Sequence, residues 1–447
     1  MENKLPNGWT SCSLKDVVSS RKGKKPNAVI NHAKKGYDPY ILIDELEGNS
    51  PRTYTNDSKI PRATEKDVLL VWDGSIGKCA SGLSGAVGST IAVLSPKNGL
   101  NTKYLEYFIK RSKNYITETS TGSGLQHVNK NLLKTLEIPL PPKGGQKRIA
   151  DKLDVLLAKV KDAQSRLDKI PLILKRFRQS VLAAAFSGEL TKEWRAKNSS
   201  YMANNDLDFI KDFILKSKIT NREKKVLEEI YKACLDPYEE QFVVPLSWKA
   251  CCIGMVGLVN NGSTPSRKIA GYWNGPIPWI SSGEVRNNII SESREKITQK
   301  GLDNCSSKLF PFGTVLIAMI GEGKTRGQSA ILNIDAAINQ NIAAIQISHG
   351  RINPEYLWFW FQFQYENNRN YGSGSGPQAL NSQRVRELPF VLAPKAEQDE
   401  IVKKIKSSFD ELDNFIERYR KAKNYTDKLE QSILAKAFRG ELVSQDK

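Results

Sequence analysis

A glycine-rich turn that carries a lysine is the pattern in this 447-residue chain that comes closest to catalytic chemistry. Residues 318–325 read Ala-Met-Ile-Gly-Glu-Gly-Lys-Thr after an apolar segment, which fits a relaxed phosphate-binding loop of an ATPase. Ala318 replaces the first glycine of the stricter motif, and residues 326–332 do not begin a helical ATPase core. The related turn at residues 73–78 is followed by Cys79, which offers no hydroxyl group for magnesium. We therefore interpret the segment as an ordinary turn whose Lys324 and Arg326 contact phosphates of a polyanion.

A second catalytic possibility is an adenine methyltransferase, which holds a flipped base in an Asn/Asp-Pro-Pro-aromatic loop. Asp236-Pro237-Tyr238 lacks one of the two prolines, and residues 274–277 fit no better. No glycine-rich cofactor loop follows a first strand. The sequence therefore favours a protein that recognises its ligand without modifying it.

Metal and disulfide chemistry find little support in the sequence. The six cysteines form no C-x-x-C pair, and Cys251 and Cys252 are adjacent. Only three histidines are present. No apolar run reaches the roughly 18 residues of a membrane span, and the first residues contain no apolar signal core. We expect a protein of the reducing cytoplasm without a metal site.

The charge distribution points to a polyanion. The formal net charge is +19 and the pI is about 9.5. Basic residues outnumber acidic ones by 7 in residues 1–140 and by 5 in residues 241–390, whereas the two balance in residues 191–240. A summed positive potential attracts phosphates. Two separate basic segments suit a two-site contact with DNA.

The chain contains an internal repeat, which indicates how these charges are organised. Residues 136–143 match residues 388–395, and residues 179–190 match residues 431–442. Both matches, and the pair Gln146 and Gln398 between them, have an offset of 252 with no gap. The same offset joins residues 122–126 to residues 374–378. We conclude that the chain is a duplication.

The beginnings of the two copies follow a different offset. Residues 5–9 resemble residues 244–248 at an offset of 239, so the second copy carries net insertions. A constant frame with variable contents is expected if the two copies do the same task on different targets. Ordinary drift between the copies is the alternative.

Each copy begins with a segment that predicts mixed, strand-rich structure. Residues 67–72 and 314–320 predict one pair of strands, and residues 90–94 and 342–346 predict another. Tyr104–Ile109 and Tyr356–Phe361 predict short helices. The predicted fold class is therefore α+β, with two strand-rich heads.

A long helix is predicted after each head. Ile149, Leu153, Leu156, Val160, Ala163, Leu167 and Ile170 form a heptad seam, and Ile401, Ile405, Ser408, Leu412, Phe415, Tyr419 and Ala422 follow the same spacing. The first helix would span roughly 65 Å at about 1.5 Å per residue. Pro171 is expected to kink or split it, and Gly188 and Gly440 are expected C-terminal stops. Antiparallel packing of the two helices would give a pseudo-twofold spacer between the heads.

The whole chain resembles the specificity subunits of type I restriction–modification enzymes. The resemblance rests on the order of head, long helix, head and long helix, on the motifs at residues 5–9 and 244–248, and on the helix ends at residues 185–190 and 437–442. Residues 191–240 match least. The implied domains are a target recognition domain at 1–143, a spacer helix region at 144–190, a helical linker at 191–240, a second recognition domain at 241–394, and a second spacer helix region at 395–447.

This resemblance implies a subunit in which each head reads half of a bipartite, asymmetric sequence in double-stranded DNA. The helices would set the gap and dock two methyltransferase subunits, which two restriction subunits join. No cofactor is expected in this chain, because S-adenosylmethionine, ATP and magnesium would belong to the partners. Helix-end residues are the predicted docking contacts, namely Phe186, Gly188, Glu189, Phe438, Gly440 and Glu441.

The repeat separates the candidate DNA contacts into those that both heads share and those that differ between them. Features common to both heads predict phosphate contacts or a loop-stabilising network, and features that differ predict base readers. A charged surface loop without a partner is the alternative for each basic segment. The predicted contacts of the first head are Arg21, Lys22, Lys24, Lys25, Ser75, Lys78, Gln126, His127, Asn129 and Lys130. Those of the second head are Ser263, Thr264, Arg267, Lys268, Lys324, Arg326, Gln378 and Asn381.

Two other functions remain open from the sequence. A catalytic DNA methyltransferase or ATPase would show activity from this chain alone. A helical scaffold that binds DNA without specificity would bind all duplexes with equal affinity.

Overall fold

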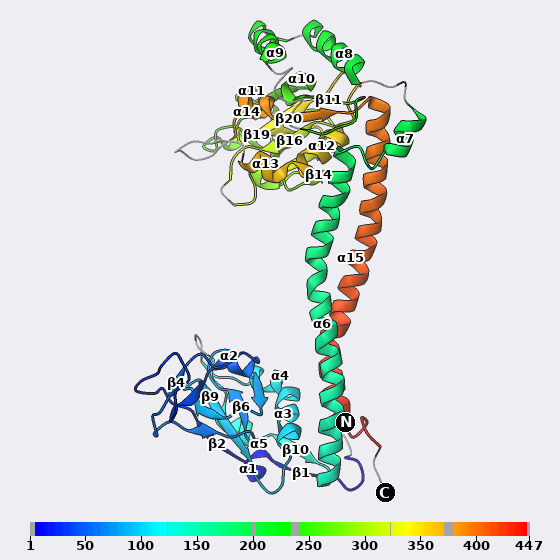
Figure 1. The fold of residues 1–447 in the computed structure, drawn as a ribbon. Coiled ribbons are helices and arrows are strands. Elements are labelled where there is room, and N and C mark those ends of the chain that lie inside the picture. Colours follow the sequence, from blue (N-terminus) through cyan, green and yellow to red (C-terminus); the bar gives the residue numbers. More distant parts are fainter. Residues whose placement is uncertain are drawn as a thin grey trace. The chain divides into compact units, whose positions relative to one another are not determined.

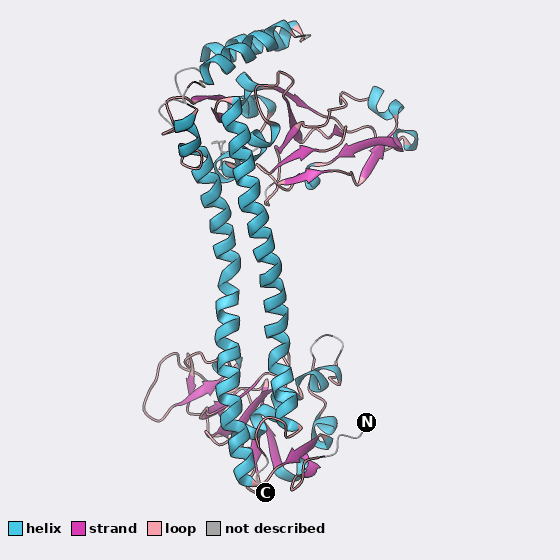
Figure 2. Cartoon of the chain, turned by 90° about the vertical axis from the view of Figure 1, so that its right-hand side faces the viewer, coloured by secondary structure: helices cyan, strands magenta, loops and turns pink. Residues whose placement is uncertain are grey.

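The chain forms two compact units in a computed structural model, which describes residues 5–122, 124, 126–198, 200, 203–217, 219–233, 242–321, 323–370 and 380–444. Unit 1 comprises Met1–Ile170 and Glu417–Lys447, and unit 2 comprises Pro171–Ile416. Figures 1 and 2 show that each unit contains a strand-rich head and parts of two long helices. The predicted α+β class with two heads is confirmed.

The head of unit 1 has two four-stranded sheets, in the orders β2-β9-β6-β7 and β4-β3-β8-β5, and a two-stranded sheet of β1 and β10. Its elements are β1 (Thr10–Ser13), α1 (Leu14–Val17), β2 (Val18–Lys22), β3 (Asp38–Ile41), α2 (Ile43–Leu46), β4 (Tyr54–Thr55), β5 (Arg62–Ala63), β6 (Val68–Val71), β7 (Cys79–Ser81), β8 (Gly85–Val87), β9 (Ile91–Pro96), α3 (Thr102–Arg111), α4 (Lys113–Glu118), α5 (Lys130–Thr135) and β10 (Glu137–Leu140).

The head of unit 2 repeats this plan with additions. Its sheets have the orders β12-β19-β16-β17-β14, β15-β13-β18 and β11-β20. Its elements are β11 (Lys249–Cys252), α10 (Ile253–Val256), β12 (Leu258–Asn261), η1 (Ala270–Tyr272), β13 (Trp273–Ile280), η2 (Ser282–Glu284), β14 (Asn288–Ile290), β15 (Glu295–Ile297), α11 (Gln299–Asp303), β16 (Val315–Ala318), β17 (Ser329–Leu332), β18 (Ala337–Ile338), β19 (Ile342–Gln346), α12 (Pro354–Phe363), α13 (Tyr365–Asn370), α14 (Ser382–Glu387) and β20 (Pro389–Leu392).

The two-stranded sheet of each head explains why the repeat has two offsets. In unit 1, β1 pairs with β10 so that Cys12 lies opposite Ile138, and in unit 2 Cys251 lies opposite Phe390. The first strand of each head therefore follows the offset of 239 and the last follows 252. The insertions fall between these strands, inside the head.

Two long helices follow the heads, α6 (Lys143–Phe186) and α15 (Lys395–Phe438), of 44 residues each. Of the two predicted effects of Pro171, the split is wrong, because α6 continues through that residue. The kink stays a prediction. The proline removes one backbone hydrogen bond, but the turns on either side keep theirs. The boundary between the two units nevertheless falls at Pro171, so the compact units differ from the predicted domains.

The predicted seam is correct for α6 and partly wrong for α15. Seam positions of α6 from Ile149 to Ile170 are buried or half-buried. In α15, however, the side chain of Phe415 is 48% exposed and Ala422 is exposed, whereas Ile416 and Lys423 are half-buried. Tyr419 is half-buried as predicted, whereas Ile416 and Lys423 take the inward positions expected of Phe415 and Ala422; Lys423 bonds to Asp168 of α6 at 2.6 Å.

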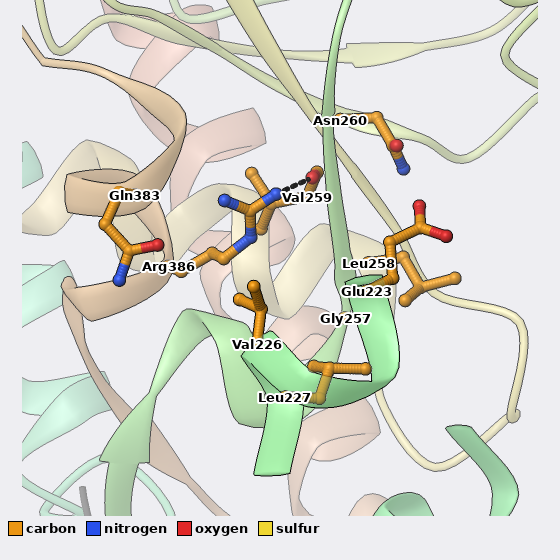
Figure 3. Close-up of a pocket in the computed structure, with 9 residues that line it drawn as sticks. All are labelled: Glu223, Val226, Leu227, Gly257, Leu258, Val259, Asn260, Gln383 and Arg386. Carbon is orange, nitrogen blue, oxygen red and sulfur yellow. Dashed lines mark hydrogen bonds between the residues drawn. The ribbon is translucent and has the colours of Figure 1, made fainter. Parts of the chain in front are cut away.

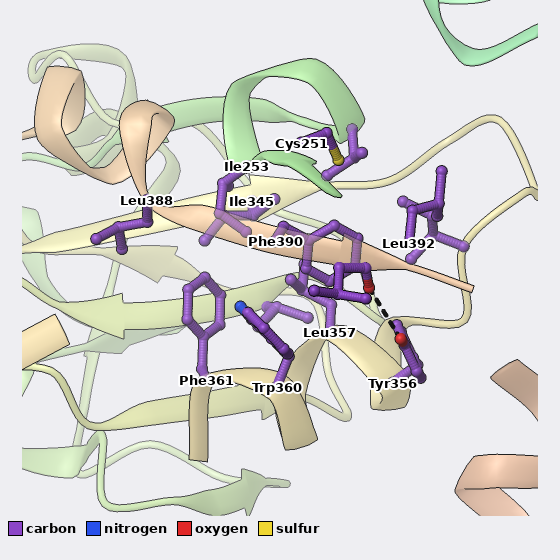
Figure 4. Packing of buried hydrophobic residues seen from close by; sticks show 14 of the residues in the cluster. Cys251, Ile253, Ile345, Tyr356, Leu357, Trp360, Phe361, Leu388, Phe390 and Leu392 are labelled. Carbon is purple, nitrogen blue, oxygen red and sulfur yellow. Dashed lines mark hydrogen bonds between the residues drawn. The ribbon is translucent and has the colours of Figure 1, made fainter. Parts of the chain in front are cut away.

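The end of each helix completes the core of the other copy's head. Phe438 packs on Tyr104 and Phe108 of α3, at centroid distances of 4.9 and 5.7 Å. Phe186 packs on Tyr356 and Trp360 of α12, at 5.2 and 5.1 Å. Figure 4 shows the buried aromatic cluster around Tyr356 and Trp360. The repeated sequence is head plus helix, but the compact unit exchanges the helix ends.

A buried glutamine joins each helix start to its head. The Gln146 side chain donates to Pro141 O and accepts from Asn101 N, at 3.1 and 2.9 Å. Gln398 bonds to Ala393 O and Asn353 N in the same way, at 2.7 and 2.9 Å. The match between Gln146 and Gln398 therefore has a structural cause.

The segment predicted as a linker is helical and belongs to unit 2. Its helices are α7 (Lys192–Lys197), α8 (Ala203–Lys216) and α9 (Asn221–Ala233). Ile210 of α8 and Ile230 of α9 lie in the core of the unit. A hollow of about 300 Å³ lies between α9, β12 and α14. Figure 3 shows the residues that line it, among them Arg386, which donates to Val259 O. No helix in the described part of the chain has the length and apolarity needed to cross a membrane.

Candidate nucleic-acid interface

A turn at the end of β2 places the basic segment of unit 1. A Cβ atom on Gly23 would lie 2.2 Å from Gly88 O and 2.4 Å from Val87 O, so only glycine fits. The amides of Gly23 and Lys24 donate to Ile91 O and Val87 O, at 2.8 and 3.0 Å. The backbone is thus fixed against β8 and β9, while the side chains beside it are exposed.

Unit 2 builds the same turn at the end of β12. A Cβ atom on Gly262 would lie 1.8 Å from Ile338 O, and the Ser263 amide donates to that oxygen at 3.0 Å. Gly23 and Gly262 follow the offset of 239, and Val87 and Ile338 end equivalent strands. The two heads therefore hold one backbone turn in place with different side chains around it, Lys24 in unit 1 and Ser263 in unit 2.

A buried carboxylate brings together two predicted contacts of unit 1. Asp73, 8% exposed, lies 2.6 Å from Lys22 Nζ and 2.6 Å from His127 Nδ1. Burial by itself would raise the pKa of Asp73, but the hydrogen bonds from His127 and Lys22 and the charge of Lys22 hold that pKa below its ordinary value. Asp73 is not among the contacts predicted from the sequence, although its position directly after a fully buried strand was a usable signal.

Two further predicted contacts lie beside this cluster. The Gly74 amide donates to Gln126 O at 3.0 Å, and His127 exchanges backbone hydrogen bonds with Thr121. The turn with exposed Ser75 and the loop with exposed Gln126 are therefore neighbours.

The other basic residues predicted as DNA contacts in unit 1 fall into two groups, those with a partner side chain or carbonyl in the part of the chain that the structure describes and those without one there. Lys24, Lys25 and Lys130 are exposed and have no ion pair or side-chain hydrogen bond within the described residues. Arg21 instead donates to Ser95 Oγ and Arg62 O, at 3.1 and 2.8 Å. Lys78 pairs with Glu47. Both Nη atoms of Arg21 therefore already donate hydrogen bonds within the head, which connect β2 to β9 and β5. They are not available to read DNA bases.

In unit 2, three of the predicted contacts are held by other side chains. Thr264 Oγ1 donates to Gln340 Oε1 at 2.6 Å, and Trp279 Nε1 donates to Ser263 O at 3.1 Å. Arg267 forms a two-pronged ion pair with Glu295. Lys268 is exposed without such a partner in the described part of the chain.

The apparent phosphate-binding loop is part of a β-hairpin. Strand β16 ends at Ala318, and the chain returns antiparallel to it as β17. A phosphate-binding loop needs a helix at this point. Lys324 is exposed in the turn and Arg326 is half-buried. Gln378, another predicted contact, lies outside the described residues.

Two predicted contacts shared by the heads are helix caps. Asn129 Oδ1 accepts from Asn131 N at 3.2 Å, and Asn381 Oδ1 accepts from Arg384 N at 2.8 Å. These bonds begin α5 and α14. Of the two interpretations that the sequence left open, the geometry favours the loop-stabilising one for both residues.

The predicted docking residues also need correction. Phe186 and Phe438 are 3% and 2% exposed, so their side chains cannot contact a partner. Gly188 and Gly440 end their helices at positive φ, +80° and +77°. Glu189 and Glu441 are exposed, and Glu441 pairs with Arg439 at 2.6 Å. The repeated motif at the two helix ends therefore mainly fills the core with its phenylalanine and ends the helix with its glycine.

The chain is similar to known proteins over nearly its whole length. Residues 6–171 and 245–423 match the family of the type I restriction modification DNA specificity domain. The EcoDI specificity subunit of Escherichia coli is 27% identical over 452 residues, which cover 99% of this chain and 90% of that relative. The EcoKI specificity subunit of Escherichia coli K12 is 25% identical over 475 residues, covering 99% and 91%.

Solved structures agree with the fold. A chain from work on complex assembly and conformational transition of the type I R-M system has a TM-score of 0.64 at 17% identity, covering 98% of this chain and 99% of that one. The HsdS subunit from Thermoanaerobacter tengcongensis has a TM-score of 0.57 at 17% identity, covering 98% of each chain. With two matched domains and whole-length relatives, the chain belongs to the family of type I restriction–modification DNA specificity subunits.

Proposed function

We propose that this chain selects a bipartite, asymmetric DNA sequence for a type I restriction–modification complex, with each head reading one half. The observation that carries the proposal is the glycine-fixed turn, which presents lysines in unit 1 and Asn261, Ser263 and Thr264 in unit 2. Fixed backbone with exchanged side chains is what two readers of different sequences require. The names of the relatives, which are specificity subunits, support it.

The proposal assigns catalysis to other subunits. Two methyltransferase subunits would carry S-adenosylmethionine, and two restriction subunits would carry ATP and magnesium. The hairpin at residues 315–332 supports this division, because it takes the place of the ATPase helix.

The direct test is methylome sequencing of cells that express the complex. We expect modified sites with two short half-sequences separated by a constant gap. Changing Lys22 and Asp73 in unit 1 should alter one half-sequence only, because both residues lie in that head. A contiguous motif, or modification without sequence preference, would contradict the proposal.

Lys24→Gln and Lys25→Gln are expected to weaken binding to every duplex. Each exposed lysine that meets a phosphate releases counterions, so the slope of log K against log salt should fall by about 0.9 per lysine. The measurement is a salt titration of fluorescent duplex binding. Lys66→Gln is the matched control. Lys66 is also exposed, but it lies before β6, whereas Asp73 of the proposed DNA-binding cluster lies after that strand. An unchanged slope in both variants would remove these lysines from the interface.

An exposed apolar face on the helix pair of unit 2 supports methyltransferase docking. The side chains of Ile173, Phe177 and Phe415 are 59%, 46% and 48% exposed. Ile173, Phe177 and Phe415 each precede a half-buried position of the seam. In an antiparallel pair, positions one before the seam lie on the same side. The Arg178 guanidinium lies over the Phe409 ring, 4.4 Å from its centroid, so α6 and α15 contact each other next to this face.

Phe177→Asp is expected to weaken methyltransferase binding by about 2 kcal/mol or more, as loss of a central aromatic contact does. Co-purification and sedimentation would measure it. Leu172→Asp is the control, because Leu172 is 54% exposed on the same helix but points away from the seam. If Phe177→Asp assembles as the wild type does, this face is not the docking surface.

A further inference from the structure

Head 2 is longer than head 1 between the glycine-fixed turn and the central strand. Gly23 and Val68 are 45 positions apart, whereas Gly262 and Val315 are 53 apart. Strand β13 has eight residues where its counterpart β3 has four. Strand β13 pairs in parallel with β18, and β3 pairs in parallel with β8. The added residues therefore belong to head 2 alone, in the part of the repeat that varies.

The longer strand β13 carries two tryptophans that position Arg267. Trp273 Nε1 and Trp279 Nε1 donate to Ser266 O and Ser263 O, at 3.2 and 3.1 Å, so both indoles hold the segment after the turn. The Arg267 guanidinium stacks on the Trp273 ring, 4.0 Å from its centroid. Both oxygens of Glu295 accept from Arg267, with Nη2 to Oε2 at 2.9 Å.

The arginine borders an open hollow of about 520 Å³. Three cations line it, Arg267, Arg294 and Lys296, against the single anion Glu295. Arg294 and Lys296 are exposed, and neither side chain pairs with an acid in the described part of the chain. The hollow thus carries an excess of positive charge on a rigid aromatic wall.

Glu295 occupies the fork in the way a phosphate would. A guanidinium presents parallel N–H groups that fit two oxygens of a carboxylate or of a phosphate equally well. The hydrogen bond from Arg267 lowers the pKa of Glu295, so the carboxylate is charged. The pair is solvent-accessible, with side chains 57% and 38% exposed, and an exposed pair of this kind exchanges partners readily.

We propose that this hollow is a phosphate site of head 2 for the DNA backbone, and that Glu295 holds Arg267 in place until a backbone phosphate displaces it. The proposal rests on the proposed function and goes beyond it, because it names a site and a resident competitor. The phosphate would meet Arg267, Arg294 and Lys296 together, whereas Glu295 engages only the first of these. In the free protein the carboxylate keeps the guanidinium over the Trp273 ring.

The test compares duplex affinities of the full chain assembled with its partner subunits. Arg267→Gln and the double change R294Q/K296Q should each weaken binding on the order of tenfold at low salt and flatten the salt slope by about 0.9 per lost contact. Glu295→Gln should strengthen binding several-fold, on the scale of one freed contact. Lys300→Gln is the charge-matched control, being exposed on α11 and outside the hollow. Thermal unfolding of each variant at the wild-type midpoint verifies folding.

Three results would overturn the site. Unchanged binding by Arg267→Gln would remove the arginine from the interface. Weaker binding by Glu295→Gln would make the carboxylate a positioning group rather than a competitor. Competition by inorganic phosphate at constant ionic strength, lost in R294Q/K296Q, would identify a free phosphate as the occupant. In each of these cases sequence-specific binding by the wild-type complex would leave the proposed function standing, whereas a wild-type complex without specific binding would end both.

Discussion

Replacing Glu397 with alanine is expected to lower the free energy of unfolding of unit 2 by about 3–5 kcal/mol. The carboxylate is 1% exposed and accepts three hydrogen bonds. These come from Thr191 Oγ1 at 2.7 Å, Arg195 Nη1 at 2.6 Å and Trp248 Nε1 at 2.8 Å. Alanine would leave Arg195 Nη1 and the buried indole N–H of Trp248 without their acceptor, while Arg195 Nη2 keeps its bond to Gly188 O. Denaturant unfolding followed by tryptophan fluorescence measures the loss.

Glu411→Ala is the control for this variant, because Glu411 is exposed on the same helix and should change stability little. Glu397→Gln should fall between the two, since an amide oxygen still accepts but carries no charge. A loss below about 1 kcal/mol for Glu397→Ala, the level of an exposed pair, would show that the carboxylate does not hold the unit together. The repeat has Gly145 at the equivalent position, so unit 1 is built without this carboxylate.

Truncating the phenylalanine at each helix end should destabilise the opposite copy's head. Phe438→Ala is expected to cost unit 1 about 3–5 kcal/mol, and Phe186→Ala to cost unit 2 a similar amount, because each ring fills a closed aromatic pocket. Hydrogen exchange would report this as faster exchange in α3 for Phe438→Ala and in α12 for Phe186→Ala.

The decisive result of that experiment is which head each variant loosens. Phe415→Ala, on the same helix as Phe438 but 48% exposed, should leave protection in both heads unchanged. If Phe186→Ala instead loosened α3 and left α12 protected, the exchanged packing of the helix ends would be refuted.

Local pattern was enough to predict much of the fold. The apolar runs at residues 68–71 and 315–318 are buried strands, and residues 342–346 form the predicted strand. The helix seam failed at Phe415 and Ala422, whereas Tyr419 between them is half-buried as predicted. The seam of the second helix was taken from the spacing of the first, so it included Phe415 rather than Ile416. That spacing could not show that Lys423 bonds to Asp168 of the other helix.

The site was harder to predict, because its key feature is which cation meets which acid. Lys22 and Arg267 were chosen for their charge and position in a variable segment, and His127 lies in the loop that both heads share. Their partners Asp73 and Glu295 lie 51 and 28 residues from Lys22 and Arg267, and no local spacing links them. Lys24 and Lys25 were predicted as DNA contacts because they belong to a basic run in a segment that differs between the heads, and that assignment stays a prediction. The linker helices were missed as core because their apolar faces meet head 2 only in three dimensions.

The exchange of helix ends also sets the order in which the chain can fold as it is made. Unit 2 is one continuous stretch, but the core of unit 1 needs Leu434, Ala437 and Phe438. At roughly 5–20 residues per second, synthesis brings these residues some tens of seconds after head 1 has emerged. The head translated first is therefore completed last, and a chain interrupted before α15 ends cannot offer a finished head 1 to DNA.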